Sequence, residues 1–234
     1  LANDSYAEMT ERYPGRFTAL ATTPLPHGEA AAREVERAMD DLGMPGINVS
    51  TLVLDKTLKT DAFNPMWEAV DRREGVVFVH AAGNACNSPL IDDHGLKWIV
   101  GAPFEDTIGL LHLLQANIPG RFPNIKFIVA HLGGPLSFHL QRIDDISEHW
   151  GADFPDKPSN MLQSIWFDSV NSHAPALQCT VETYGSDRIL LGSDFPYFQN
   201  DLYQRSVDYI KHADLGEETV EGILGSNAEK ILGG

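Results

Sequence analysis

The sequence predicts an α/β fold built on parallel strands, and two observations carry this prediction. Strand-like and helix-like segments alternate along the 234 residues with little interruption. Several of the strand-like segments are continuous apolar runs, which is typical of parallel strands covered on both faces. No linker, composition shift or low-complexity segment divides the chain. We therefore expect residues 1–234 to form a single domain.

Six segments have the composition of strands, and helices are expected between and after them. The predicted strands are 17–23, 46–54, 76–80, 126–131, 164–169 and 188–194. One helix has Ala31, Val35, Ala38 and Leu42 on one face and ends at Gly43, and another begins at Asn64 and Pro65. Further helices are expected from about 104 to 118, from 135 to 150, and at 174–184, 202–212 and 217–232.

Two architectures fit this alternation of strands and helices, namely a doubly wound open sheet and a (β/α)8 barrel. A barrel needs eight β/α units, and only six are visible in the sequence. The count of units alone therefore favours the open sheet.

The composition excludes several classes of partner. The net charge of −16 argues against nucleic acid and against an anionic membrane surface. Cys86 and Cys179 form neither a disulfide framework nor a zinc-ribbon spacing. No apolar run approaches the roughly 20 residues of a membrane span, and no signal peptide is visible. We therefore expect a soluble cytoplasmic protein.

Three predicted strands end in residues that can bind a metal ion or transfer a proton. They are His80, His131 and Asp194, and the sequence indicates no such residue at the ends of the other strands. The carboxyl ends of parallel strands line the active site in barrels and open sheets alike. A single histidine here is more often a hydrogen-bonded core residue, and a single aspartate is often a helix cap or turn former. Three together favour a functional site.

The glycines beside these residues have two possible roles. Gly133 and Gly134 let the backbone approach a substrate closely, or they form a tight turn into the helix that begins at Pro135. Gly192 is expected to make room for the neighbouring strand end.

The other histidines lie in helices or loops. Of these, His94 and His173 lie in loops near strand ends and are the two candidates for contact with substrate. The sequence contains no GxSxG, GxxxxGK[ST] or GxGxxG motif, which excludes the commonest hydrolase, phosphate-loop and dinucleotide sites.

The motifs together resemble those of the amidohydrolase superfamily. They are a strand that ends in histidine, a later strand that ends in HLGG, a final LLGSDFP and a closing helix with SNAEKIL. Within the superfamily, the motifs resemble those of the amidohydrolase-related branch typified by aminocarboxymuconate-semialdehyde decarboxylase. This resemblance implies a (β/α)8 TIM barrel that is incomplete here, with about strands 3 to 8 present. The family's first strand carries an HxH pair of metal ligands, which is absent from this sequence. We therefore expect the chain to be the C-terminal three-quarters of a longer protein, which agrees with its start in what looks like the end of a helix.

The resemblance also implies roles for individual residues. His80 and Asp194 match metal ligands, and Asp194, partly freed from the metal, would also act as a catalytic base. His131 matches the histidine that acts as acid or base beside the metal. Arg142 falls where relatives place an arginine that reaches the substrate carboxylate of a neighbouring subunit, although an ordinary surface arginine is at least as good an interpretation. The loop 81–95 differs from that of the type enzyme, which leaves the substrate open.

The implied function is a metal-dependent non-oxidative decarboxylase of a small aromatic or unsaturated carboxylic acid. A metal-dependent hydrolase of an ester, lactone or amide is the alternative on the same scaffold, and a non-catalytic relative or inert fragment is the third. The expected cofactor is a divalent metal, zinc first and manganese second, which this shorter chain could lack. The expected partners are the small-molecule acid and further copies of the chain in a dimer or tetramer.

Overall fold

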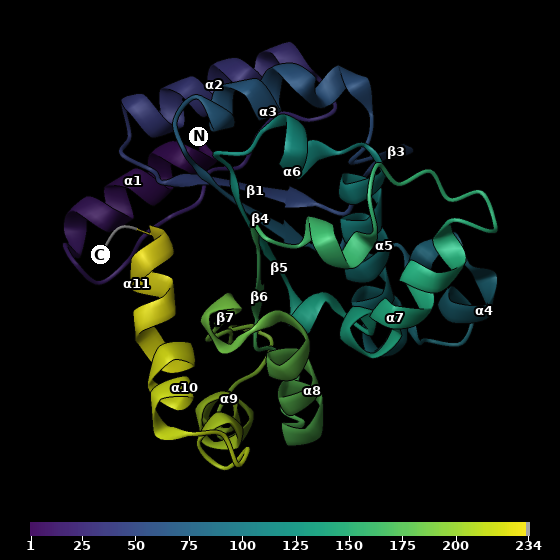
Figure 1. Cartoon of the computed structure of the whole chain (residues 1–234). Helices are drawn as coiled ribbons and strands as arrows, with labels where there is room; N and C mark the ends of the chain where they lie inside the picture. Colours follow the sequence, from purple (N-terminus) through teal and green to yellow (C-terminus); the bar gives the residue numbers. More distant parts are fainter. Residues whose placement is uncertain (233–234) are drawn as a thin grey trace.

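A parallel sheet forms the centre of the computed structural model, which describes residues 1–232 (Figure 1). Its five strands are β1 (Gly46–Ser50), β4 (Val76–His80), β5 (Lys126–Val129), β6 (Ile165–Asp168) and β7 (Ile189–Leu190). They lie in the order β1-β4-β5-β6-β7, and every neighbouring pair is parallel. The prediction of a parallel α/β fold is therefore confirmed.

The strands are shorter than the sequence predicts. The predicted strand 46–54 ends at Ser50, and its remainder begins a small antiparallel hairpin of β2 (Leu52–Val53) and β3 (Lys56–Thr57). The predicted strand 17–23 is reduced to one parallel bridge between Ala21 and Ile47. Five strands and this bridge thus stand where six strands are predicted.

Helices separate the strands along the chain. Their bounds are α1 (Ala2–Arg12), α2 (Gly28–Asp40), α3 (Asn64–Asp71), α4 (Pro89–Asp92), α5 (Ala102–Gln115), α6 (Ile118–Arg121), α7 (Leu136–Ser147), α8 (Ala174–Tyr184), α9 (Asp201–Lys211), α10 (Glu217–Glu221) and α11 (Asn227–Leu232). The predicted helix 217–232 is α10 and α11 joined by a π-helical turn, Gly222–Ser226. Within residues 1–232, no helix is long and apolar enough to cross a membrane.

The two faces of the sheet are covered differently. One face carries Val77, Val79, Phe127, Val129 and Phe167, which pack in the main core with buried residues of the helices. The opposite face carries a much smaller cluster of Val76, Ile128 and Leu190, which Ile231 of α11 helps to cover. In Figure 1 the helices α2, α3, α5, α7 and α8 form an arc around the sheet, from the top of the view over the right to the bottom. Helix α11 lies on the left, outside this arc.

This one-sided covering contradicts the doubly wound sheet that the count of units favours. A doubly wound sheet carries helices on both faces, whereas a barrel carries them only outside. Among residues 1–232, no strand pairs with the free edge of β7, and only the bridge at Ala21 lies beyond β1. The fold is an incomplete (β/α)8 barrel, as the resemblance implies, and the count misleads because it assumes that all strands are present.

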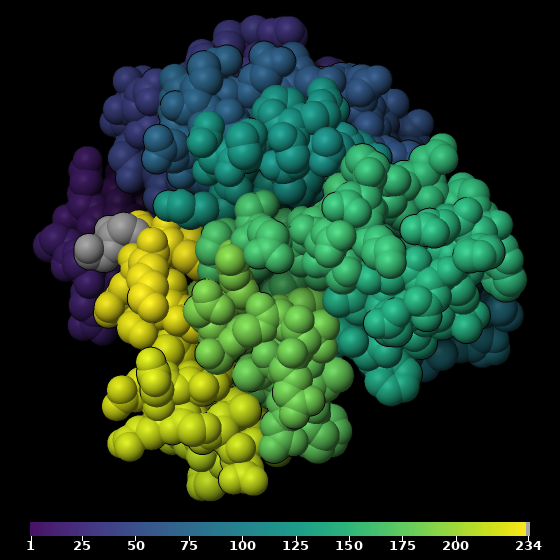
Figure 2. Space-filling model, in the orientation of Figure 1, coloured from purple at the N-terminus to yellow at the C-terminus, as the bar shows by residue number. Residues whose placement is uncertain are grey.

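The C-terminal helix is tied to the end of the sheet by one buried side chain. Asn227 is 4% exposed, and its side-chain amide donates to the carbonyls of Ser186 and Ile189 at 2.9 and 2.8 Å. This asparagine belongs to the SNAEKIL motif, so the motif has a structural role beside β7. Figure 2 shows the chain wrapping the molecule in successive bands, with the N-terminal and C-terminal segments on the same side.

We expect Phe127→Ala to lower the free energy of unfolding by about 3–5 kcal/mol, because it empties a core position. Phe127 is fully buried between sheet and helices, and its ring meets that of Trp67 at a centroid distance of 6.1 Å. The matched control is Phe138→Ala, since Phe138 is 80% exposed, and it should change stability by no more than about 0.5 kcal/mol. Urea unfolding measures both, and equal losses would contradict the assignment of the core face.

Candidate active site

The three strand-end residues singled out in the sequence lie together in space. His80 is the last residue of β4, His131 lies two residues beyond β5, and Asp194 lies four residues beyond β7. Each offers one ligand atom, and these atoms all lie within 4.8 Å of one another. The parallel register explains the grouping, because it brings the carboxyl ends of β4, β5, β6 and β7 to one edge of the sheet.

The environment of His80 leaves one ring nitrogen free. Its Nδ1 lies 3.0 Å from the carbonyl oxygen of Ala81, which can only accept, so Nδ1 carries the proton. The other nitrogen, Nε2, makes no hydrogen bond among the described residues. The ring centroids of His80 and His131 are 5.0 Å apart. The contact with Ala81 thus orients the His80 ring so that Nε2 is available to a metal ion.

His131 is held by two buried carboxylates. Its Nδ1 donates to Oδ2 of Asp106 at 2.6 Å, and its backbone amide donates to Oδ1 of Asp168 at 2.8 Å. The same Oδ1 accepts the amide of Val170 at 3.0 Å. The pair with Asp106 fixes the tautomer of the ring, which leaves Nε2 of His131 directed away from Asp106. Together these bonds set both the backbone and the ring of His131.

The same contacts change how the histidine and the carboxylate titrate. Burial alone would lower the pKa of His131, but the hydrogen bond and charge of Asp106, with the charges of Asp168 and Asp194, outweigh it and raise that pKa above its usual value. Burial raises the pKa of Asp106 to about 6, against the effect of its hydrogen bond with His131. The environment of His131 therefore stabilises the protonated ring more than water does.

Asp194 has a carboxylate that is not committed elsewhere. It is half-buried, and within residues 1–232 its side chain makes no hydrogen bond, whereas its backbone carbonyl accepts the amide of Tyr197 at 2.9 Å. Its φ is +52°, and that of His131 is +55°, so both residues have left-handed backbone conformations. Such conformations are uncommon outside glycine and cluster at functional sites.

The donor set fits a divalent metal ion. His80 offers a free Nε2 and Asp194 offers an uncommitted carboxylate, while His131 contributes a ring nitrogen to the same group. Imidazole and carboxylate are the ligands that zinc and manganese bind in proteins. The geometry thus supports a metal centre at the carboxyl edge of the sheet.

Three buried carboxylates at this edge are absent from the residues predicted from the sequence. Asp168 ends β6, so the prediction that no other strand ends in such a residue is wrong. Glu105 and Asp106 lie in the first turns of α5 and are 4% and 0% exposed. The signal for Asp168 was available in the segment SIWFDS. The burial of Glu105 and Asp106 depends on tertiary packing, because charged residues at the start of a helix are usually solvent-exposed.

The glycines near the site allow close packing of backbone. A Cβ on Gly134, whose φ is +63°, would lie 1.9 Å from the carbonyl oxygen of Pro103. Thr107 donates its hydroxyl to the carbonyl of Gly133 at 2.6 Å. A Cβ on Gly192 would lie 2.9 Å from the Cβ of Asp168, so Gly192 does make room for the neighbouring strand end. The turn after His131 is therefore packed against the first turn of α5.

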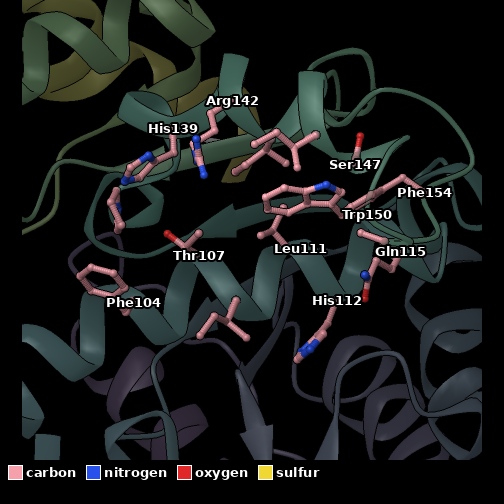
Figure 3. Close-up of a pocket in the computed structure, with 15 residues that line it drawn as sticks. Phe104, Thr107, Leu111, His112, Gln115, His139, Arg142, Ser147, Trp150 and Phe154 are labelled. Atoms are coloured by element: carbon pink, nitrogen blue, oxygen red, sulfur yellow. The ribbon is translucent and has the colours of Figure 1, made fainter. Parts of the chain in front are cut away.

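Arg142 lies away from the three strand-end residues, on α7. It lines a groove of about 530 Å³ between α5 and α7, together with apolar side chains such as Leu111 and Trp150 (Figure 3). His80, His131 and Asp194 do not line this groove. Arg142 is exposed and forms no ion pair among the described residues. His94 and His173 are likewise exposed and lie outside the three-residue group.

Comparison with known proteins identifies the family. The family model described as Amidohydrolase (Amidohydro_2) matches residues 1–234, so the chain belongs to this family of amidohydrolases. It is 29% identical over 240 residues to 2-amino-3-carboxymuconate-6-semialdehyde decarboxylase of Dictyostelium discoideum, which covers 99% of this chain and 65% of that protein. It is 26% identical to the gamma-resorcylate decarboxylase of a Polaromonas species, over 99% of this chain and 74% of the relative.

A solved structure shows the same fold. The crystal structure of 5-carboxyvanillate decarboxylase from Novosphingobium aromaticivorans, complexed with manganese and 4-hydroxy-3-methoxy-5-nitrobenzoic acid, matches with a TM-score of 0.89 and 26% identity. The match covers 99% of this chain and 68% of that one. The chain thus spans about two thirds of the length of this structure and of the Dictyostelium relative.

We expect Asp106→Asn to lower the pKa of His131, because the carboxylate that stabilises the protonated ring is removed. The measurement is an NMR titration of the His131 ring in metal-free protein. Asp168→Asn is the matched control, since Asp168 bonds the amide of His131 and not its ring, so a smaller decrease in pKa is expected. An unchanged pKa in Asp106→Asn would contradict the role given to this hydrogen bond.

Proposed function

We propose that the chain carries the catalytic centre of a metal-dependent non-oxidative decarboxylase that acts on a small aromatic or unsaturated carboxylic acid. The observation that carries this proposal is the Asp106–His131 pair, whose 2.6 Å hydrogen bond lies beside two uncommitted metal donors. A histidine whose ring is oriented by a buried carboxylate next to a metal centre suits proton transfer to carbon. The names of the relatives, which are decarboxylases, support the same reaction class.

In this proposal His80 and Asp194 hold a divalent ion, zinc or manganese. When bound, the ion supplies a Lewis acid that polarises an oxygen of the substrate. Manganese is supported by the bound metal of the 5-carboxyvanillate decarboxylase structure, and zinc by the ligand types. A catalytic zinc ion usually has three protein ligands, and this assignment accounts for two of them.

His131 performs the proton transfer. Its Nε2–H donates a proton to the substrate carbon that bears the carboxylate, and a new C–H bond forms. The electron pair of this C–H bond comes from the π system of the substrate. The bond between that carbon and the carboxylate then breaks, its electron pair restores the π system, and CO2 leaves. Asp106 stabilises the imidazolium before the transfer and keeps Nδ1 protonated afterwards, so that Nε2 can be reprotonated. Asp194 would help to hold the ion, and its carboxylate would also serve as a base towards water.

The decarboxylase can be separated from the hydrolase by its products. The protein, freed of metal with a chelator and reloaded with zinc or manganese, is given gamma-resorcylate, 5-carboxyvanillate and 2-amino-3-carboxymuconate-6-semialdehyde, and CO2 release is followed. Ester and lactone substrates are assayed in parallel. Release of CO2 that depends on the metal supports the proposal. Hydrolysis without CO2 release would favour the hydrolase, and neither activity together with no metal uptake would favour a non-catalytic relative.

Variants of His80 and His131 should fail differently. His80→Ala should lower metal occupancy, because one of few ligands is lost. His131→Asn should keep metal content near that of the wild type while turnover falls by about 10²–10⁴-fold, the usual contribution of a general acid or base. Elemental analysis beside a steady-state assay measures both quantities. Equal loss of metal from both variants would make His131 a ligand, and unchanged turnover in His131→Asn would end its role in proton transfer.

We also propose that the protein acts as a homo-oligomer, a dimer or tetramer, in which Arg142 binds the substrate carboxylate of a neighbouring subunit. Arg142 is exposed and without an ion pair among the described residues, and it lies apart from the site of its own chain.

A cytoplasmic location is proposed as well, in keeping with the unpaired Cys86 and Cys179.

Arg142→Ala should raise KM by about 10–100-fold, the equivalent of one hydrogen bond to a charged group. Arg33→Ala, an exposed arginine on α2, is the control and should leave KM unchanged. Mixing the His131→Asn and Arg142→Ala proteins, and assaying the mixture at a substrate concentration where each variant alone has little activity, tests the neighbour directly. If Arg142 acts across subunits, mixed oligomers contain sites with both residues intact and activity returns. No return of activity in oligomers that have exchanged subunits would contradict this proposal.

A further inference from the structure

Glu105 is a buried carboxylate whose partners are all backbone amides. It is 4% exposed, and its Oε2 accepts the amide of Gly83 at 2.7 Å. Its Oε1 accepts the amides of Asn84 and Cys86 at 2.8 and 3.2 Å. Among the described residues it forms no ion pair, so these amides alone replace the water that the carboxylate has lost.

The amides belong to a loop with an unusual backbone. Ala85, Cys86 and Asn87 have φ values of +56°, +52° and +54°. Tight turns can direct several N–H groups towards one point, where they form a concave site that favours an anion, and here the amides of Gly83, Asn84 and Cys86 meet at Glu105. The carboxylate of Glu105 fills this concavity. The carboxylate of Glu105 therefore stabilises this conformation of the loop. An uncharged side chain at position 105 would leave the amides without a strong acceptor.

This loop begins directly after His80. The ring of His80 donates from Nδ1 to the carbonyl of Ala81, and the next amide, that of Ala82, donates to Oγ1 of Thr51 at 3.0 Å. The amide of Gly83 is then bound by Glu105. The carbonyl of Ala81, which orients the His80 ring, thus lies between the end of β4 and two hydrogen-bonded amides, those of Ala82 and Gly83. Its direction depends on these two hydrogen bonds.

We infer that Glu105 is a positioning residue for His80. Its carboxylate holds the backbone that follows β4, that backbone fixes the carbonyl of Ala81, and this carbonyl sets the rotation of the His80 ring so that Nε2 faces Asp194. The inference rests on the proposed function in one respect, namely that His80 binds the divalent ion. Asp106, the next residue along α5, orients His131, so one helical turn positions both histidines of the site.

Glu105→Gln tests this role with little change in volume. The amide keeps one oxygen, but its NH2 group cannot accept from a backbone amide, so at least one of the three bonds is lost. The affinity for Mn²⁺ should fall about 10–100-fold, as is typical when a group that orients a metal ligand is removed. Free Mn²⁺ is measured by EPR, and the visible spectrum of the Co²⁺-loaded protein should change because the ligand geometry changes.

Asp144→Asn is the matched control. Asp144 is also a buried carboxylate, 8% exposed, and it accepts a backbone amide, that of Ser159, at 3.1 Å on the side of α7. Both variants lose a similar hydrogen bond and should lose stability in urea unfolding. Only Glu105→Gln should change the Mn²⁺ affinity and the Co²⁺ spectrum, because a merely stabilising cap would not alter either.

The outcomes separate this inference from the proposed function. Wild-type Mn²⁺ affinity and an unchanged Co²⁺ spectrum in Glu105→Gln would overturn the positioning role, whatever the activity. If Glu105→Gln does not fold, Glu105→Asp, which withdraws the carboxylate by one methylene, is judged by the same two measurements. A wild-type protein that binds Mn²⁺ but releases no CO2 from any acid would overturn the proposed function and leave the inference standing. A wild-type protein that binds no divalent ion would overturn both.

Discussion

Two adjacent carboxylates at the start of α5, Glu105 and Asp106, join the outer helices to the carboxyl ends of β4 and β5. Buried carboxylates are unfavourable unless hydrogen bonds replace their lost water. Glu105 has three backbone amides as partners, and Asp106 has the ring of His131. Any shift of α5 along the sheet would leave one of these groups unpaired, so the geometry of the site depends on where this helix packs.

Apolar contacts hold α5 in that place. Leu110, Leu113 and Leu114 are fully buried in the main core, one or two turns beyond the carboxylates. Gly109 lets the helix approach the end of β1, because a Cβ there would lie 2.6 Å from the Cγ2 of Thr51. The same helix thus buries leucines against the sheet and carries the polar groups that orient both histidines. Core packing and site geometry are in this way parts of one arrangement.

Several residues at the site have strained backbone conformations. His131, Leu132 and Asp194 have left-handed conformations, as does the loop that Glu105 holds, and each such residue costs about 1–2 kcal/mol. Leu132 is 1% exposed, so its conformation is held by tight packing. Hydrogen bonds from the amide of His131 to Asp168 and from the loop to Glu105 offset part of this strain. Strain that surrounding bonds maintain is typical of sites that must hold a fixed geometry.

Local pattern determined most of the elements. The predicted helix at 174–184 is α8, and the alternation of apolar runs with amphipathic segments correctly predicts a parallel sheet. His80, His131 and Asp194 were visible in the sequence because parallel strands place their carboxyl ends at one edge, a rule that needs no coordinates. The HLGG and GSDFP motifs identified the family for the same reason, since they carry these residues.

Only the tertiary structure decided the rest, because it depends on contacts between residues far apart in the chain. The number of strands does not reveal that one face of the sheet carries the main core and the other only a small cluster, and hence that the sheet is part of a barrel. The pairing of Asp106 with His131 spans 25 residues, and that of Asp168 with the His131 amide spans 37. Nothing local distinguishes Glu105 and Asp106 from the exposed acids of other helices. Their burial, and with it their role at the site, follows from the packing of α5 against the sheet.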